Sequence, residues 1–346
     1  MEHPHQFKLK AQLQTSAKIL SVGTYLPPQV VKSDDLFDEI KSEQQYGLPR
    51  DFMSSTMGII ERRMATPDMQ PSELAIEAAK SALDAAPDVR LRDIGLVIFC
   101  GIERDQPEPA TAHTVQHALG IRAENVFDVA NACLGFVDGL KIANSYIAAG
   151  VVKNALVTTG EVSTRVLRSC VEQLKSGVSV QRAKEMIGGL SVGDAGGAVV
   201  LGASEDSGFV LFNNFVDSAH AQKCNYHFDE EGLVRGQMLM AKILAHGIKM
   251  HRELIPHTLR RLGWEEFDWV LSHQTGKRNL NAFAKLPGIR ESRMIKTYEK
   301  FGNTTTGTFA LGWEQLHRSG KVHAGSRVGG LFAGSGLATC QFGLLV

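Results

Sequence analysis

The sequence lacks the features that mark several classes of protein. Its five cysteines are an odd number and include no CxxC pair, which argues against a disulfide framework or a zinc knuckle and for a reducing compartment. Basic and acidic residues balance at 37 each, so no overall field attracts nucleic acid. The longest apolar stretch, near residues 94–102, is too short to span a membrane, and residues 1–8 lack the apolar core of a signal peptide. These absences predict a cytoplasmic protein.

The first half of the chain alternates between helical and strand-like patterns. After a polar lead of about 17 residues, residues 18–28 read as a strand stopped by prolines. Helical apolar spacing over 71–86 and 134–151 is followed each time by a buried-strand pattern, at 94–100 and 155–160. A glycine-rich turn at 193–202 feeds a further strand. This alternation predicts an α/β fold with a mainly parallel sheet.

The second half repeats the same order of elements. We expect helices over 238–262, after Gly276 and over 306–317, and strands over 269–272, 327–332 and 337–345. A length of 346 residues suits one large or two fused domains. We therefore predict two pseudo-duplicated halves, residues 18–203 and 208–346, with segment 161–190 as a loop that carries a cap or a substrate entrance.

Three residues are candidates for covalent catalysis. Cys133 follows a strand-like stretch and precedes a helical one, and the first turn of a helix stabilises a thiolate through its unpaired N–H groups and dipole. His273 and Asn303 lie in similarly marked settings downstream. Each residue alone is better explained as structural. Together they form a set that supports acyl-enzyme chemistry.

The motifs around these residues resemble those of the ketosynthase III branch of the thiolase-like condensing enzymes. Segments 131–136, 272–274 and 301–305 match the nucleophile, histidine and asparagine motifs in order, and 58–63 and 192–198 match further signatures. The resemblance implies a five-layered αβαβα fold, a homodimer, loading of an acyl group on Cys133 and then carbon–carbon bond formation. It involves no cofactor beyond acyl-CoA as substrate.

The chemistry also suggests roles for the neighbouring groups. His273 and Asn303 are expected to donate hydrogen bonds to the second substrate as it becomes an enolate. The backbone of Ser335, between Gly334 and Gly336, is expected to complete an oxyanion hole with that of Cys133.

Glu108 departs from the usual family pattern. It lies 25 residues before Cys133, where enzymes that use malonyl extenders commonly have an apolar residue that enters the partner subunit's pocket. A base is needed there only if an α-proton must be removed. Glu108 followed by proline resembles the OleA-like branch, which joins two acyl-CoA chains head to head. The alternative is a solvated loop carboxylate.

The expected coenzyme A site also differs from the usual family pattern. Phe52 and Thr56 stand where typical members place the tryptophan and arginine that hold adenine, so the acyl donor could be CoA or an acyl carrier protein. Arg278 is a candidate phosphate ligand at the entrance, as are Arg165, Arg168 and Lys277; lone surface charges are the alternative.

Several alternatives stay open from the sequence. They are decarboxylative condensation with a malonyl thioester, a C–O or C–N forming acyltransferase on the same fold, and a catalytically reduced partner of a heteromeric synthase. Asp194 is expected to cap backbone groups rather than to act in catalysis. The remaining cysteines are expected to be structural: Cys100, Cys170, Cys224 and Cys340.

Overall fold

The computed structural model describes residues 16–346 and arranges them around two sheets. The polar lead and the predicted absence of a signal peptide fall mainly on residues 1–15, outside the described residues. The first sheet has five strands, in the order β1 (Ser16–Tyr25), β7 (Ala195–Ser204), β6 (Asn154–Glu161), β4 (Ile94–Cys100) and β5 (Asn125–Val129). The second has four, in the order β11 (Trp269–Ser272), β12 (Arg327–Gly334), β13 (Ala338–Leu345) and β8 (Gly208–Val216).

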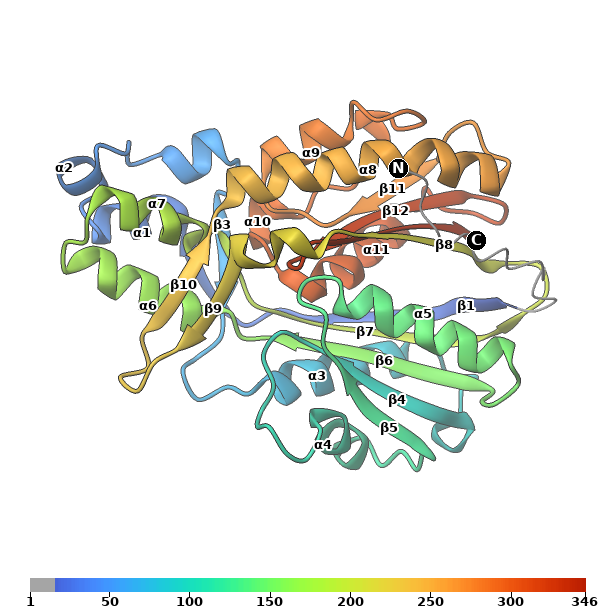
Figure 1. The fold of residues 1–346 in the computed structure, drawn as a ribbon. Coiled ribbons are helices and arrows are strands. Elements are labelled where there is room, and N and C mark those ends of the chain that lie inside the picture. Colours follow the sequence, from blue (N-terminus) through green and yellow to red (C-terminus); the bar gives the residue numbers. More distant parts are fainter. Residues whose placement is uncertain (1–15) are drawn as a thin grey trace.

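Helices cover both sheets and fill the space between them, which gives five layers (Figure 1). The middle layer contains α5 (Gly135–Ala148) and α11 (Thr308–Arg318). The outer layers are α3 (Pro71–Asp84) and α4 (Thr111–Ala118) on the first sheet, and α8 (Met240–Leu262) and α9 (Lys277–Phe283) on the second. Phe136 and Phe309 of the two middle helices pack together, with ring centroids 5.7 Å apart, in a core shared with Phe332 and Phe342.

The prediction of mainly parallel sheets was only partly right. Strands β5, β4 and β6 are parallel to one another, whereas β7 is antiparallel to its neighbour β6 and β1 is antiparallel to β7. In the second sheet β11 and β12 are parallel, β13 is antiparallel to β12, and β8 is antiparallel to β13. A strand buried on both faces is apolar whatever its direction, so its sequence does not reveal that direction. The order parallel, antiparallel, antiparallel recurs in both sheets, which supports the predicted halves; their boundaries stay a prediction.

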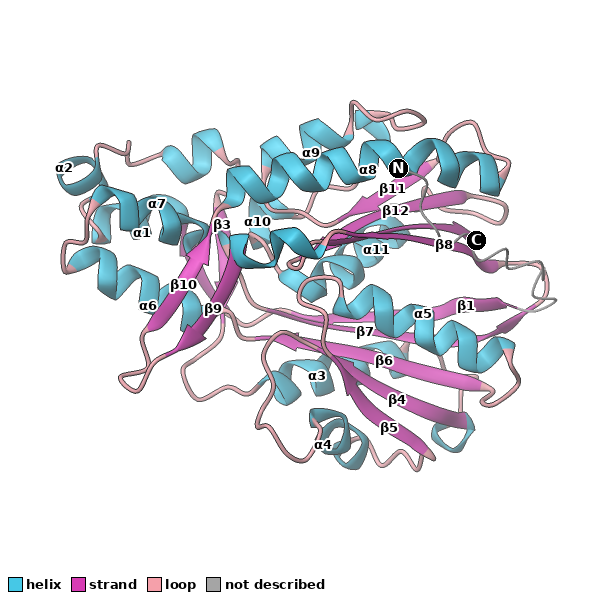
Figure 2. Cartoon of the chain, viewed as in Figure 1, coloured by secondary structure: helices cyan, strands magenta, loops and turns pink. Residues whose placement is uncertain are grey.

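The segment predicted as a loop at 161–190 is instead largely helical. It forms α6 (Thr164–Lys175) and α7 (Val180–Met186), beside a two-stranded ribbon of β9 (Cys224–Phe228) and β10 (Val234–Met238) that the sequence did not reveal (Figure 2). The same end of the molecule contains α1 (Ser33–Glu39), α2 (Ser42–Tyr46), α10 (Tyr298–Phe301) and the strand pair β2 (Gln29–Lys32) and β3 (Glu61–Met64). These additions cover one end of the two sheets.

Asp194 connects two segments of this end to the first sheet. Its buried carboxylate accepts hydrogen bonds from the backbone N–H of Ala65 at 2.7 Å and of Thr164 at 3.0 Å, and from the Thr164 hydroxyl. Burial raises its pKa to about 6 against the effect of these donors. The predicted capping role is confirmed.

Helix α3 packs directly on glycines of three adjacent strands. A Cβ at Gly160 would lie 1.8 Å from the carbonyl oxygen of Pro71, and one at Gly196 would lie 2.1 Å from that of Leu74. Gly23 is similarly close, at 2.2 Å, to the carbonyl oxygen of Ala78. The helix backbone therefore touches the sheet without intervening side chains.

Gly160→Ala is expected to destabilise the protein by about 1–3 kcal/mol, because α3 must move away from the sheet to admit the methyl group. Gly247→Ala, inside α8, is the matched control, since a Cβ there meets nothing within 4 Å; it should stabilise by about 0.5–1 kcal/mol. Urea unfolding of both variants measures the difference. Equal stabilities of the two variants would contradict the close helix–sheet contact.

Candidate active site

Cys133 lies in the turn between strand β5 and helix α5, as the sequence predicts. The preceding residue, Ala132, has φ of 46°, a left-handed conformation that costs a non-glycine residue about 1–3 kcal/mol. Backbone N–H groups of Leu134 and Gly135 donate to the carbonyls of Asn131 and Ala132, at 3.1 and 3.0 Å. The tight turn places the thiol at the wall of a cavity just before the first turn of α5.

Gly334 brings the turn between β12 and β13 against the Cys133 turn. A Cβ at Gly334 would lie 2.8 Å from the carbonyl oxygen of Asn131 and 3.0 Å from the backbone nitrogen of Leu134. Ser335 follows directly and lines the same cavity as Cys133. This approach places the predicted oxyanion backbone beside the thiol.

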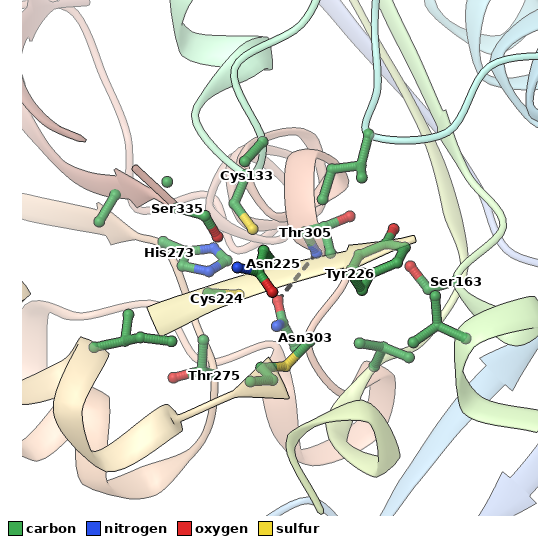
Figure 3. A pocket seen from close by; sticks show the side chains of 18 of the residues that line it. Cys133, Ser163, Cys224, Asn225, Tyr226, His273, Thr275, Asn303, Thr305 and Ser335 are labelled. Atoms are coloured by element: carbon green, nitrogen blue, oxygen red, sulfur yellow. Dashed lines mark hydrogen bonds between the residues drawn. The ribbon is translucent and has the colours of Figure 1, made fainter. Parts of the chain in front are cut away.

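His273 and Asn303 enter the cavity from the second half of the chain. His273 follows β11, and its backbone N–H donates to the carbonyl of Leu331 at 2.9 Å. The side-chain oxygen of Asn303 accepts the N–H of Thr305 at 3.1 Å (Figure 3), so its amide NH₂ is left to donate elsewhere. Both side chains are buried.

One cavity of about 630 Å³ is lined by Cys133, His273, Asn303 and Ser335. Figure 3 shows Cys133, His273 and Asn303 directed into the same space from separate parts of the chain. The remaining wall is mainly apolar, with Val166, Val192, Met238, Met240, Ile243, Leu244, Ile248, Phe283 and Leu337 among its members. A cavity of this size and lining suits an apolar small molecule with a few polar groups at one place.

Burial favours the uncharged forms of Cys133 and His273 in the free protein. Desolvation raises the pKa of the Cys133 thiol well above its usual value and lowers that of His273 to about 4. The expected thiolate is therefore wrong for the free protein, because loss of solvation outweighs the helix N-terminus. A neutral thiol next to a neutral imidazole needs proton transfer at the moment of attack.

The β9–β10 ribbon contributes wall residues that sequence reasoning missed. Cys224, Asn225 and Tyr226 of β9 all line the cavity. Cys224 was expected to be purely structural; it instead faces the site and shares a hydrogen bond with Ser335. No local pattern distinguishes it, because only the ribbon brings it to Cys133.

A carboxylate that the sequence analysis did not single out, that of Glu103, also reaches the cavity. Glu103 lines it and accepts a hydrogen bond from the Tyr226 hydroxyl at 3.3 Å. Desolvation raises the pKa of Glu103, although Arg165, 3.8 Å away, opposes this. Behind it, fully buried Glu161 accepts from Thr306 and has a pKa of about 7, raised by burial.

The other predicted site residues do not line this cavity. Glu108 is exposed on the loop that borders it, in which residues 102–107 do form part of the wall. Phe52 stacks on Phe37 with centroids 6.0 Å apart, and Thr56 ends the same short π-helix. Arg278 is exposed on α9. Whether these residues contact coenzyme A, or Glu108 a partner's cavity, stays a prediction.

The basic side chains proposed as phosphate ligands at the entrance differ in whether they already form ion pairs. Arg165 contacts Glu103, and Arg168 contacts Glu39 at 3.5 Å. Lys277 is exposed. Within residues 16–346 no group of three or more His, Cys, Asp or Glu side chains could hold a metal ion, and no helix there is long and apolar enough to cross a membrane.

Comparison with known families agrees with this geometry. The family model of 3-oxoacyl-[acyl-carrier-protein] synthase III matches residues 127–218, and the model of its C-terminal part matches residues 258–342. Beta-ketoacyl-[acyl-carrier-protein] synthase III of Yersinia enterocolitica is 29% identical over 90% of this chain and 94% of the relative. The enzyme of the same name from Neisseria gonorrhoeae is 29% identical over 92% and 97%.

Solved structures of OleA from Xanthomonas campestris are also similar. The cerulenin-bound structure has a TM-score of 0.90 at 26% identity and covers 97% of this chain and 99% of its own. A variant with bound lauric acid and lauroyl-CoA has a TM-score of 0.89 at 26% identity, with 96% and 99% covered. The five-layered fold predicted from the sequence is confirmed.

The two buried histidines of the cavity predict a loss of stability on acidification. Burial lowers the pKa of His251 to about 3 and that of His273 to about 4, against 6.5 for an ordinary histidine. Below pH 6.5 the unfolded chain therefore binds protons that the folded protein does not. The free energy of unfolding therefore decreases as the pH is lowered.

His251→Leu should remove one such group. Between pH 7 and pH 5 its free energy of unfolding should fall by about 2 kcal/mol less than that of the unaltered protein. Urea titrations at the two pH values measure this. Parallel losses in both proteins would mean that His251 is not held neutral.

Proposed function

Because this chain belongs to the ketosynthase III branch of the thiolase-like acyltransferases, we propose that it joins two acyl-CoA molecules head to head to give a β-keto product. The carrying observation is the convergence of Cys133, His273, Asn303 and Ser335 on one mainly apolar cavity of about 630 Å³. Condensation of acyl thioesters is the general activity; the head-to-head mode is the specific proposal.

Acyl transfer begins with attack of the Cys133 sulfur on the thioester carbonyl. His273, neutral because it is buried, accepts the thiol proton as the new C–S bond forms. The backbone N–H groups of Cys133 and Ser335 stabilise the oxyanion. The CoA thiolate then leaves and is protonated by His273, which leaves a neutral acyl-enzyme.

Condensation uses the same cavity a second time. A base removes an α-proton from the second acyl-CoA, and His273 and Asn303 donate hydrogen bonds to the resulting enolate. The enolate carbon attacks the acyl carbonyl on Cys133 and the C–S bond breaks. The Cys133 thiolate then regains a proton in exchange for the one that the base took, which restores both groups. The oxygen of Asn303 is already held by Thr305, so its NH₂ is available for this role.

Glu108 is the proposed base, supplied by the neighbouring subunit of a homodimer. It lies on the exposed loop next to the cavity but does not line the cavity of its own chain. Strand β5 supports such a dimer: it ends the first sheet with one open edge, and its residues are only half-buried. Glu103 is the competing base, because it lines the cavity of its own subunit.

Decarboxylative condensation with a malonyl thioester is the second candidate, favoured by the names of the relatives, beta-ketoacyl-[acyl-carrier-protein] synthase III. It needs no base, since loss of carbon dioxide creates the carbanion. The acyl donor is acyl-CoA in the proposal, with an acyl carrier protein as the alternative. A C–O or C–N forming acyltransferase would not need the Asn303 donor.

Asn303→Ala is expected to separate the two half-reactions. Intact-protein mass spectrometry should still detect acyl-Cys133 after incubation with decanoyl-CoA, while condensation falls by roughly 10²–10³-fold because one enolate donor is lost. Cys133→Ala is the control that should carry no acyl group. Unimpaired condensation by the Asn303 variant would place enolate stabilisation elsewhere.

Glu108→Gln tests the mode of condensation. With decanoyl-CoA alone, the unaltered protein should form a 2-alkyl-3-keto product; the variant should be acylated but should not condense, because it lacks the base. Glu103→Gln is the matched control and should still condense. Product that forms only with a malonyl thioester, and equally in both variants, would favour the decarboxylative route.

The same variants test whether Glu108 acts across subunits. Cys133→Ala and Glu108→Gln chains are each inactive alone, but a mixed dimer contains one site with both Cys133 and a partner's Glu108. Co-expression should restore about a quarter of the unaltered activity, since half of the dimers are mixed and each has one of two sites intact. No recovery in dimers verified as mixed would exclude action in trans.

A further inference from the structure

The turn that carries Asn303 is held in an unfavourable conformation. Thr305 has φ of 48°, a left-handed conformation that a β-branched residue adopts only where its surroundings impose it. The backbone N–H of Thr305 donates to Asn303 Oδ1 at 3.1 Å and so orients the side-chain amide. Contacts that fix Thr305 therefore also fix the direction in which the Asn303 NH₂ points.

Thr306, the next residue, is fixed on strand β6 of the first sheet. Its hydroxyl donates to Glu161 Oε1, and the hydroxyl oxygens of Thr306 and Thr159 lie 2.5 Å apart. Since the Thr306 proton is engaged by Glu161, Thr159 is the donor in the second bond. Thr159 and Glu161 are two residues apart on β6 and therefore share one face of the strand. All three side chains are buried.

Thr306 also lies against the turn that carries Cys133. A Cβ at Gly135, the first residue of α5, would be 3.8 Å from the Thr306 methyl carbon, in ordinary van der Waals contact. Helix α5 begins two residues after Cys133. Thr306 is thus in contact with the nucleophile's turn and is bonded within the turn of Asn303, so its position affects the distance between the two catalytic residues.

Glu161 is itself held by a second segment. Its Oε1 also accepts the backbone N–H of Ile102 at 3.1 Å, so one oxygen joins the start of the loop after β4 to the turn of Asn303. Burial raises the pKa of the carboxyl group to about 7. A neutral carboxyl group still has an acceptor oxygen, so the bond to Thr306 does not require the ionised form.

Holding a turn with a buried carboxyl group is costly. Glu161 is 0% exposed and is the one ionisable side chain of β6. Burial of such a group is unfavourable unless its contacts offset the loss of solvation. Glu161 does not line the cavity. Its effect on the reaction is therefore exerted through the residues that it holds.

We propose that Glu161 is a positioning residue for condensation: by holding Thr306 it keeps the Asn303 amide directed at the enolate beside Cys133. A misplacement of about 1 Å near the reacting atoms can slow a reaction roughly a hundredfold, so a small movement of this turn is sufficient to impair condensation. The inference rests on the proposed function, since it presumes that Asn303 stabilises the enolate.

Variants at the two ends of the hydrogen bond test this. Thr306→Val removes the donor and Glu161→Leu removes the acceptor. Both should load decanoyl-CoA on Cys133 at nearly the unaltered rate but condense about tenfold more slowly, because Asn303 is used only in condensation. Condensation is measured with and without malonyl-CoA, since Asn303 has the same role in both modes. Glu161→Gln keeps an acceptor oxygen and should condense faster than Glu161→Leu.

Thr158→Val is the matched control on the same strand. It removes a buried hydroxyl that donates to the carbonyl of Ile98 at 3.1 Å, and it should alter neither half-reaction. Equal losses of loading and condensation in the Thr306 and Glu161 variants would show a general structural effect and would overturn the inference. The same loss of condensation in Thr158→Val would also overturn it.

A double variant gives a readout that a general loss of structure would not. If Glu161 acts through Asn303, then Thr306→Val should have no further effect once Asn303→Ala has removed the group that is positioned. The double variant should therefore condense within about twofold of Asn303→Ala alone. A further loss of about tenfold would mean that Thr306 and Glu161 act independently of Asn303.

Hydrogen exchange separates this inference from the proposed function. Residues 303–307 should exchange roughly tenfold faster in Glu161→Leu than in the unaltered protein, and no faster in Thr158→Val. Faster exchange in a protein that never condenses would contradict the proposed function and would support the hold of Glu161 on the Asn303 turn. Unchanged exchange in both Glu161→Leu and Thr306→Val would overturn the inference.

Discussion

The contact at Gly334 fixes the geometry on which the site depends. Cys133 belongs to the first half of the chain, and His273, Asn303 and Ser335 belong to the second. The two halves meet where Gly334 lies against the carbonyl of Asn131, at a distance that excludes any side chain. The middle helices α5 and α11 separate the two sheets, and the contact at Gly334 brings the backbone of Ser335 next to Cys133.

Desolvation is the second constraint, and it acts on four titratable groups of the cavity in the same sense. It raises the pKa of Cys133 and Glu103 and lowers that of His273 and His251. Each shift favours the neutral form. A desolvated cavity suits a neutral thioester with an apolar chain, and it makes each hydrogen bond to a developing oxyanion stronger than it would be in water.

The sequence was informative where function depends on local patterns. Cys133, His273, Asn303 and Ser335 each lie at the end of a strand or in a glycine turn, so their settings were readable, and the structure brings all four together. Cys224, Glu103, His251 and Asn279 were missed because they reach the cavity only through the packing of distant segments. The thiolate was wrongly expected because helix position is local, whereas burial is not. Direction in the sheets was misjudged for the related reason that strands buried on both faces look alike.

The β9–β10 ribbon and the start of α8 form one continuous stretch, residues 224–251, outside the two sheets except where α8 covers the second. This stretch supplies Cys224, Tyr226, Met238, Gly247 and His251 to the wall of the cavity, whereas the residues assigned to bond-making lie at strand ends and turns elsewhere. A large part of the cavity wall is thus encoded apart from the residues assigned to bond-making. Substitutions within residues 224–251 can therefore change which acyl chains the cavity accepts without altering the residues assigned to the reaction.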